Sequence, residues 1–121
     1  MKTIQISRTV LKSLYGDCTA SMTAVFSQFL NSHSEIRDNL VSSYNSGSVE
    51  SLKKFLHYHG PSFMYLGMPL VSDCFKNLEE QCKQSADHLS ISSGFSRLIQ
   101  FVDQSKQMVI KELENINKSA A

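Results

Sequence analysis

The sequence contains no tryptophan and only three cysteines, and none of these cysteines belongs to a CxxC pair. An odd number of such cysteines argues against the disulfide framework of a small secreted domain. We therefore expect reduced, buried thiols at Cys18, Cys74 and Cys82 and a cytoplasmic protein.

An excess of charge of one sign is also missing. The formal net charge is +1, and the Lys and Arg residues are scattered along the chain instead of forming a block. Nucleic acid and acidic membranes are therefore not expected as partners. The opening segment MKTIQISRTVLKSLYGD has a polar residue at every second or third position, so we expect neither a signal peptide nor a membrane-spanning helix.

Known catalytic motifs are absent as well. The sequence has no GxSxG, GxxxxGK[ST], GxGxxG or HExxH pattern, which argues against a hydrolase, a P-loop kinase, a dehydrogenase or a zinc protease. We expect a protein that is not an enzyme in its own right and that needs no cofactor.

The chain is long enough for one self-contained domain. Its 121 residues are 41% hydrophobic and 19% charged, which is typical of a globular protein with a core. We expect a single domain over residues 1–121, with a short N-terminal helix at about 2–15 and a core at about 18–117. We also expect a monomer.

Apolar residues recur with helical spacing through most of the chain. This spacing predicts helices over residues 17–31, 34–44 and 48–59, a further helix of about four turns after Pro69, and a long last helix from about Ser93 to Asn117. Residues 86–94, rich in serine, are predicted to be a connection. Residues 3–7 alternate briefly like a strand, but Ile6, Val10 and Leu14 favour a helix. The predicted fold is all-α: an antiparallel four-helix bundle with an additional short N-terminal helix.

The segment SVESLKKFLHYHG carries the most information about function. Ser48 is typical of a helix N-cap, and the following helix has an apolar face that includes His59. His57 falls on the opposite, polar face, together with Lys53 and Lys54 one turn before it. A solvent-facing imidazole beside two ammonium groups suits a nucleophile that takes up a phosphoryl group.

Other interpretations of these residues stay open. His57 alone is also compatible with an ordinary surface histidine beside two solvated lysines. His59 on the apolar face is expected to be a hydrogen-bonded core residue. A metal site is not expected, because residues at i and i+2 diverge on a helix and no Cys or carboxylate cluster completes the ligand set.

The stretch around His57 resembles histidine phosphotransfer domains of two-component phosphorelays. In that family a Ser or Asp opens a helix about nine residues before the phospho-acceptor histidine. That histidine begins the pattern H-x-x-K-G-S. After it come L-G and then a helix that contains a cysteine and L-E. This chain has Ser48, His57, Ser62, Leu66-Gly67, Cys74 and Leu78-Glu79 at these places, and the resemblance covers about residues 8–84.

The resemblance implies roles for individual residues. His57 matches the phospho-acceptor, and Glu79 matches a position that hydrogen-bonds the imidazole in several members. Lys83 matches a basic position near the phosphate, whereas Glu79 and Lys83 would otherwise be an exposed i, i+4 pair. Gly67 matches a small residue that lets the two central helices turn closely. The face around Gly60, Pro61, Ser62 and Gly67 corresponds to the partner-docking region.

The implied partners are response-regulator receiver domains and a hybrid histidine kinase. In the family, Mg²⁺ is held by the receiver domain and not by the phosphotransfer domain. The chemistry is phosphoryl transfer through a histidine intermediate, with the receiver supplying most of the electrostatic stabilisation.

Two departures from the family pattern stand directly after His57. Gly60-Pro61 replaces Lys-Gly, so the usual phosphate-pairing lysine is missing. Pro61 has no N–H to bond the carbonyl of His57, so the helix is expected to kink or loosen there. Lys53 or Lys54 is a candidate source of the missing charge.

Two rival interpretations remain at this stage. The first is an adaptor that binds a receiver or a kinase without being phosphorylated, and Gly60-Pro61 is the feature that supports it. The second is a helical protein of unrelated function, which a buried His57 or an exposed apolar patch elsewhere would favour.

Overall fold

A computed structural model describes residues 4–84 and 91–120, and every regular element within them is a helix, which confirms the all-α prediction. The helices in chain order are α1 (Arg8–Tyr15), α2 (Thr19–Asn45), α3 (Val49–His59), α4 (Ser62–Tyr65), α5 (Pro69–Gln84) and α6 (Ser92–Ala120). No helix in these described ranges is long and apolar enough to cross a membrane.

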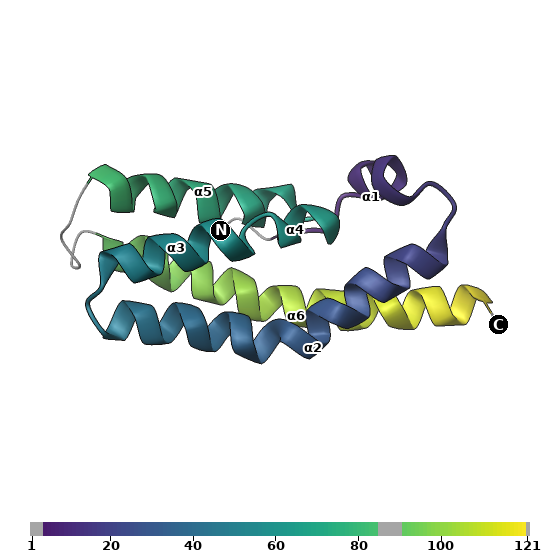
Figure 1. Ribbon diagram of the computed structural model, residues 1–121. Coiled ribbons are helices and arrows are strands. Elements are labelled where there is room, and N and C mark those ends of the chain that lie inside the picture. The colour runs from purple at the N-terminus through teal and green to yellow at the C-terminus, as the bar shows by residue number, and fades with distance from the viewer. Residues whose placement is uncertain (1–3, 85–90, 121) are drawn as a thin grey trace.

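The four larger helices α2, α3, α5 and α6 lie side by side with alternating chain direction (Figure 1). α3 packs against α2 and α5, and α6 packs against the same two helices, so the four enclose one core. The single-turn helix α4 lies against α5, and α1 contacts α2 and α4. The largest fully buried side chains are Phe26, Leu40, Leu52, Leu56, Phe63, Leu66, Met68, Val71, Phe75, Ile91, Leu98 and Val102.

α2 is one continuous helix, so the prediction of two helices at 17–31 and 34–44 is wrong. Neither proline nor glycine lies between these segments, and nothing interrupts the backbone hydrogen bonds. The buried stripe also continues, because Phe29, His33 and Ile36 are all buried at helical spacing. A hydrophobicity pattern does not count a buried histidine as core, which is why it suggests a break here.

The first helix is shorter than the predicted 2–15, because α1 begins at Arg8. Ser7 caps it, with its Oγ accepting a hydrogen bond from the N–H of Val10 at 3.3 Å. The described residues before the cap form neither helix nor strand, and the N–H of Ser7 instead donates to the carbonyl of Gly67 at 2.7 Å. This bond ties the N-terminal segment to the turn before α5.

The last helix agrees closely with the predicted range, since α6 runs from Ser92 to Ala120. The predicted connection at 86–94 is wrong for its last three residues, which are helical, and residues 85–90 lie outside the described part of the chain. The apolar residues Phe95, Leu98, Val102 and Val109 of α6 are buried at helical spacing. Leu113 and Ile116 are only half-buried, because the last turns of α6 extend beyond α3 and α5 (Figure 1).

The cysteines are reduced, but only Cys82 is buried. Cys74 is half-buried, and Cys18 is exposed at the N-cap of α2, so the prediction of three buried thiols is wrong. Cys18 Sγ lies 3.1 Å from Ser21 Oγ, and this hydrogen bond lowers the pKa of the Cys18 thiol. Local capping geometry places this cysteine outside the core.

Candidate functional site

α3 holds His57 in the orientation that its sequence predicts. Ser48 is the N-cap, and its hydroxyl accepts a hydrogen bond from the N–H of Ser51 at 3.1 Å. Leu52 and Leu56 are buried against the core. His57 points the other way, and 81% of its side chain is exposed. The buried His57 that would favour a helical protein of unrelated function is therefore not observed.

The neighbouring helix α5 brings a carboxylate to the imidazole. His57 Nδ1 lies 3.3 Å from Glu79 Oε2, and the Glu79 side chain is only 15% exposed. Lys83, one turn further along α5, has its Nζ 3.7 Å from the same oxygen and 3.9 Å from Glu80 Oε2. Three of the residues singled out from the sequence, from two helices, therefore meet at one place.

A carboxylate at Nδ1 determines which form of the imidazole suits nucleophilic attack. A neutral imidazole carries one proton, and a proton on Nδ1 faces the Glu79 carboxylate. The lone pair then sits on Nε2, the ring nitrogen turned away from Glu79. An exposed histidine without such a carboxylate would exchange freely between its two tautomers.

The two lysines before His57 have different surroundings. Lys53 Nζ lies 3.0 Å from Glu50 Oε1, and 30% of the Lys53 side chain is exposed. Lys54 is exposed and has neither an ion pair nor a side-chain hydrogen bond within the described residues. Both border an open depression of about 560 Å³, the α3–α5 hollow, which is lined by Glu50, Ser51, Lys53, Lys54, His57 and Glu79.

Helix α3 ends immediately after His57 and His59, as the following proline predicts. α3 ends at His59, Gly60 forms its C-cap, and Pro61 is the N-cap of α4. Pro61 and Ser62 are exposed beside His57, whereas Gly60 is buried. The cap itself is satisfied, since the N–H of Gly60 donates to the carbonyl of Leu56 at 3.1 Å.

Gly60 is buried because α3 and α5 approach each other closely there. A Cβ atom at this position would lie 2.9 Å from Phe75 Cβ and 3.0 Å from the carbonyl oxygen of Leu56. Both neighbours are part of, or attached directly to, the backbone, so neither moves aside easily. The lysine that the resemblance places at this position has no space here.

Gly67 lies at a different junction. Its φ of 74° is in the left-handed region and permits the turn from α4 into α5. A Cβ atom there would lie 2.8 Å from Leu11 Cδ2 of α1. The close contact between α3 and α5 is thus made by Gly60 and not by Gly67. Gly67 is buried under α1 and is not itself part of an exposed docking face.

His59 is a core residue, as predicted. It is 8% exposed, its Nε2 lies 3.3 Å from Asn39 Nδ2, and its ring stacks on Phe55 at a centroid distance of 6.0 Å. Burial lowers the pKa of His59, and the charge of Glu35 opposes this by raising it. Burial is the larger of the two effects, so the neutral form is favoured in the folded protein.

This lowered pKa has a consequence for stability. An unfolded histidine titrates near pH 6.5, so below that pH the unfolded chain binds a proton at His59 more readily than the folded one. The stabilisation from neutral His59 is complete above about pH 6.5 and declines as the pH falls toward the lower folded-state pKa. We expect urea unfolding midpoints between pH 7.5 and pH 5.5 to fall less in His59→Gln than in the wild type. An equal decline in both proteins would contradict this.

A polar contact between α2 and α6, in which only His33 is buried, is a feature that the sequence does not indicate. His33 is buried, and its Nε2 lies 3.5 Å from Asp103 Oδ1, while Arg37 Nε donates to the same oxygen at 3.0 Å. The partners are 66 or more positions apart in sequence, and no local pattern connects them. They join α2 to α6 on elements that do not carry His57.

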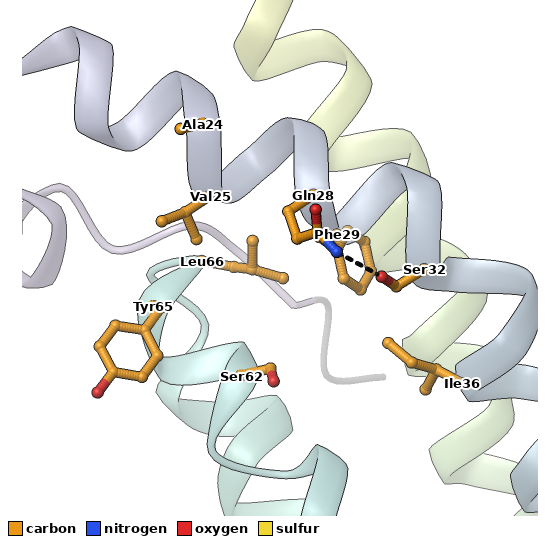
Figure 2. A pocket seen from close by; sticks show the side chains of 9 residues that line it. All are labelled: Ala24, Val25, Gln28, Phe29, Ser32, Ile36, Ser62, Tyr65 and Leu66. Atoms are coloured by element: carbon orange, nitrogen blue, oxygen red, sulfur yellow. Dashed lines mark hydrogen bonds between the residues drawn. The ribbon is translucent and has the colours of Figure 1, made fainter.

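Figure 2 shows a second hollow, the α2–α4 groove, with a volume of about 480 Å³. Val25, Phe29 and Ile36 of α2 face Leu66 across it, and Gln28 Nε2 donates to Ser32 Oγ at 3.2 Å on its rim. None of its lining residues is a His, Cys, Lys, Asp or Glu. Ser62 of α4, which is exposed, also lines this groove.

Metal ligation is not supported by the side chains in the described part of the chain. No group of three or more His, Cys, Asp or Glu residues there is arranged to hold a metal ion. This agrees with the divergence of His57 and His59, one exposed and one buried.

Nothing among protein-family models, curated proteins or solved structures matches this chain.

Proposed function

We propose that this protein is a histidine phosphotransfer domain that carries a phosphoryl group on His57 between receiver domains. The observation that supports this best is the exposed His57 imidazole with its Nδ1 3.3 Å from a largely buried Glu79 carboxylate. An oriented, accessible histidine on a rigid helix is what a phosphocarrier needs. In this proposal the fold is an antiparallel four-helix bundle of α2, α3, α5 and α6 with α1 as an additional N-terminal helix.

The proposed reaction starts from an aspartyl phosphate on a receiver domain. The lone pair of His57 Nε2 attacks phosphorus, a P–N bond forms, and the P–O bond to the aspartate breaks. The aspartate leaves as a carboxylate, while the imidazole keeps its Nδ1 proton beside Glu79 and becomes cationic. The reverse sequence transfers the group to a second receiver. Charge balances without an added acid or base.

The partner supplies the remaining chemistry. A receiver domain brings the Mg²⁺ that neutralises the transferring group, so this chain acts as a carrier and not as an enzyme with its own cofactor. The proposal places the protein in the cytoplasm, where receivers and a hybrid histidine kinase would meet it.

In this proposal the partner contacts large apolar side chains that are exposed on α3 and α4. Tyr58 is 75% exposed, and Met64 and Tyr65 of α4 are also large exposed apolar side chains. Pro61 and Ser62 lie between them in the chain and are exposed too. Exposed aromatic and methionine side chains are typical of protein interfaces.

The test is phosphorylation of purified protein by a panel of phosphorylated receiver domains. The expected result is one phosphoryl group per chain, labile in acid and stable in alkali, as a phosphoramidate bond requires. A wild-type protein that binds a receiver but accepts no label from any donor would contradict the proposal. The same exposed surface would then make a non-phosphorylated adaptor the better candidate.

The role of Glu79 gives a separate expectation. We expect Glu79→Ala to slow labelling about tenfold, because the Nδ1 proton loses the carboxylate that orients the ring. Glu79→Gln keeps an oxygen that accepts from Nδ1–H and should retain most of the rate. Initial labelling rates at a fixed donor concentration measure this, with circular dichroism to check the fold. Equal rates in wild type and Glu79→Ala would show that Glu79 does not position His57.

A further inference from the structure

We propose that Lys54 is the residue that binds the phosphoryl group on His57 and replaces the lysine that is missing after it. This inference rests on the proposed phosphocarrier function. Among the lysines near His57, Lys54 differs from Lys53 and Lys83 in having no carboxylate partner within the described residues.

Lys54 and His57 share one face of α3. Residues at i and i+3 on a helix have Cβ atoms about 5–6 Å apart, well within the reach of a lysine side chain. Both residues line the α3–α5 hollow, which has a volume of about 560 Å³. Lys54 is exposed, so its ammonium group can reach the group without rearrangement of the core.

The other nearby lysines already have carboxylate partners. Lys53 Nζ lies 3.0 Å from Glu50 Oε1. Lys83 Nζ lies 3.7 Å from Glu79 Oε2 and 3.9 Å from Glu80 Oε2. A carboxylate partner offsets part of the positive charge that these two lysines present to a phosphoryl group, whereas Lys54 has no such partner within residues 4–84 and 91–120. Its charge is available at no cost in existing contacts.

The C-terminal side of His57 offers no cation at the usual place. Gly60 is buried against Phe75, and Pro61 carries no charge. The neutralising charge therefore comes from the preceding turn of α3, and the phosphoryl group is held over the α3–α5 hollow. The side next to Pro61 is left for contact with a partner.

The experiment uses a small donor, phosphoramidate, so that receiver docking does not affect the result. Nε2 attacks phosphorus, the P–N bond of phosphoramidate breaks, and the nitrogen leaves as ammonia after taking a proton from solvent. Intact mass spectrometry gives the labelling rate, and transfer to buffer without donor gives the half-life of the phosphohistidine.

We expect Lys54→Ala to slow labelling about fivefold and to reduce its dependence on ionic strength, as befits one exposed charge pairing with a dianion. Lys54→Arg should restore most of the rate. Lys53→Ala should have a smaller effect than Lys54→Ala. Lys76→Ala, which removes an exposed lysine of α5 that does not line the hollow, should label like the wild type.

Equal labelling rates and salt dependences in wild type and Lys54→Ala would overturn the assignment, as would a larger loss in Lys53→Ala. Failure of the proposed function itself looks different. In that case the wild-type protein accepts no phosphoryl group from phosphoramidate or from any phosphorylated receiver.

Discussion

Replacing His57 with glutamine is expected to abolish phosphorylation completely while leaving the fold intact. A glutamine amide nitrogen has no available lone pair and cannot form the P–N bond. The His57 side chain is 81% exposed, so the substitution should change the unfolding free energy by less than about 0.5 kcal/mol. The measurement is the amount of acid-labile phosphoryl label that the His57→Gln protein accepts from a receiver that phosphorylates the wild type.

The second histidine of α3 is the matched control. His59→Gln removes an imidazole that lies two positions away and is buried. The His59→Gln protein should therefore still be phosphorylated. Label that persists in a folded His57→Gln protein would place the acceptor elsewhere, and loss of label in both variants would show that His59 is also required. Receiver binding to His57→Gln, measured by calorimetry, separates loss of chemistry from loss of docking.

Installing the family's lysine after the acceptor, as Gly60→Lys, is expected to damage the site. Its Cβ would lie 2.9 Å from Phe75 Cβ and 3.0 Å from the carbonyl of Leu56, so α3 must move away from α5. Overpacking of this kind costs about 3 kcal/mol of unfolding free energy. The same displacement separates His57 from Glu79, and we expect labelling to slow about tenfold.

Pro61→Lys provides the comparison, because it adds the same side chain at the next position, which is exposed. Its backbone φ of −59° and ψ of −27° suit any residue, so the expected loss of stability is below about 1 kcal/mol. Urea unfolding of both variants measures the difference. Faster labelling in a fully stable Gly60→Lys protein would show that the close α3–α5 contact is not maintained in solution.

Parts of the fold were predictable because they depend on local chemistry. Ser48 as an N-cap, the end of α3 before Pro61 and the opposite orientations of His57 and His59 all follow from residues within a few positions of each other. Predictions failed where a local pattern was ambiguous. The sequence predicts two helices at 17–31 and 34–44, where α2 is continuous through the buried His33. It also predicts a buried thiol at Cys18, which is exposed at the N-cap of α2.

The sequence by itself determined that the chain is helical and that α3 presents His57 on its polar face, since helical periodicity depends only on the order of the residues. Tertiary packing decided what surrounds the imidazole. Glu79 reaches Nδ1 only because α5 lies against α3, and α5 lies that close only because Gly60 leaves room for Phe75. Such contacts depend on the distance between helices, which the spacing within one helix does not specify.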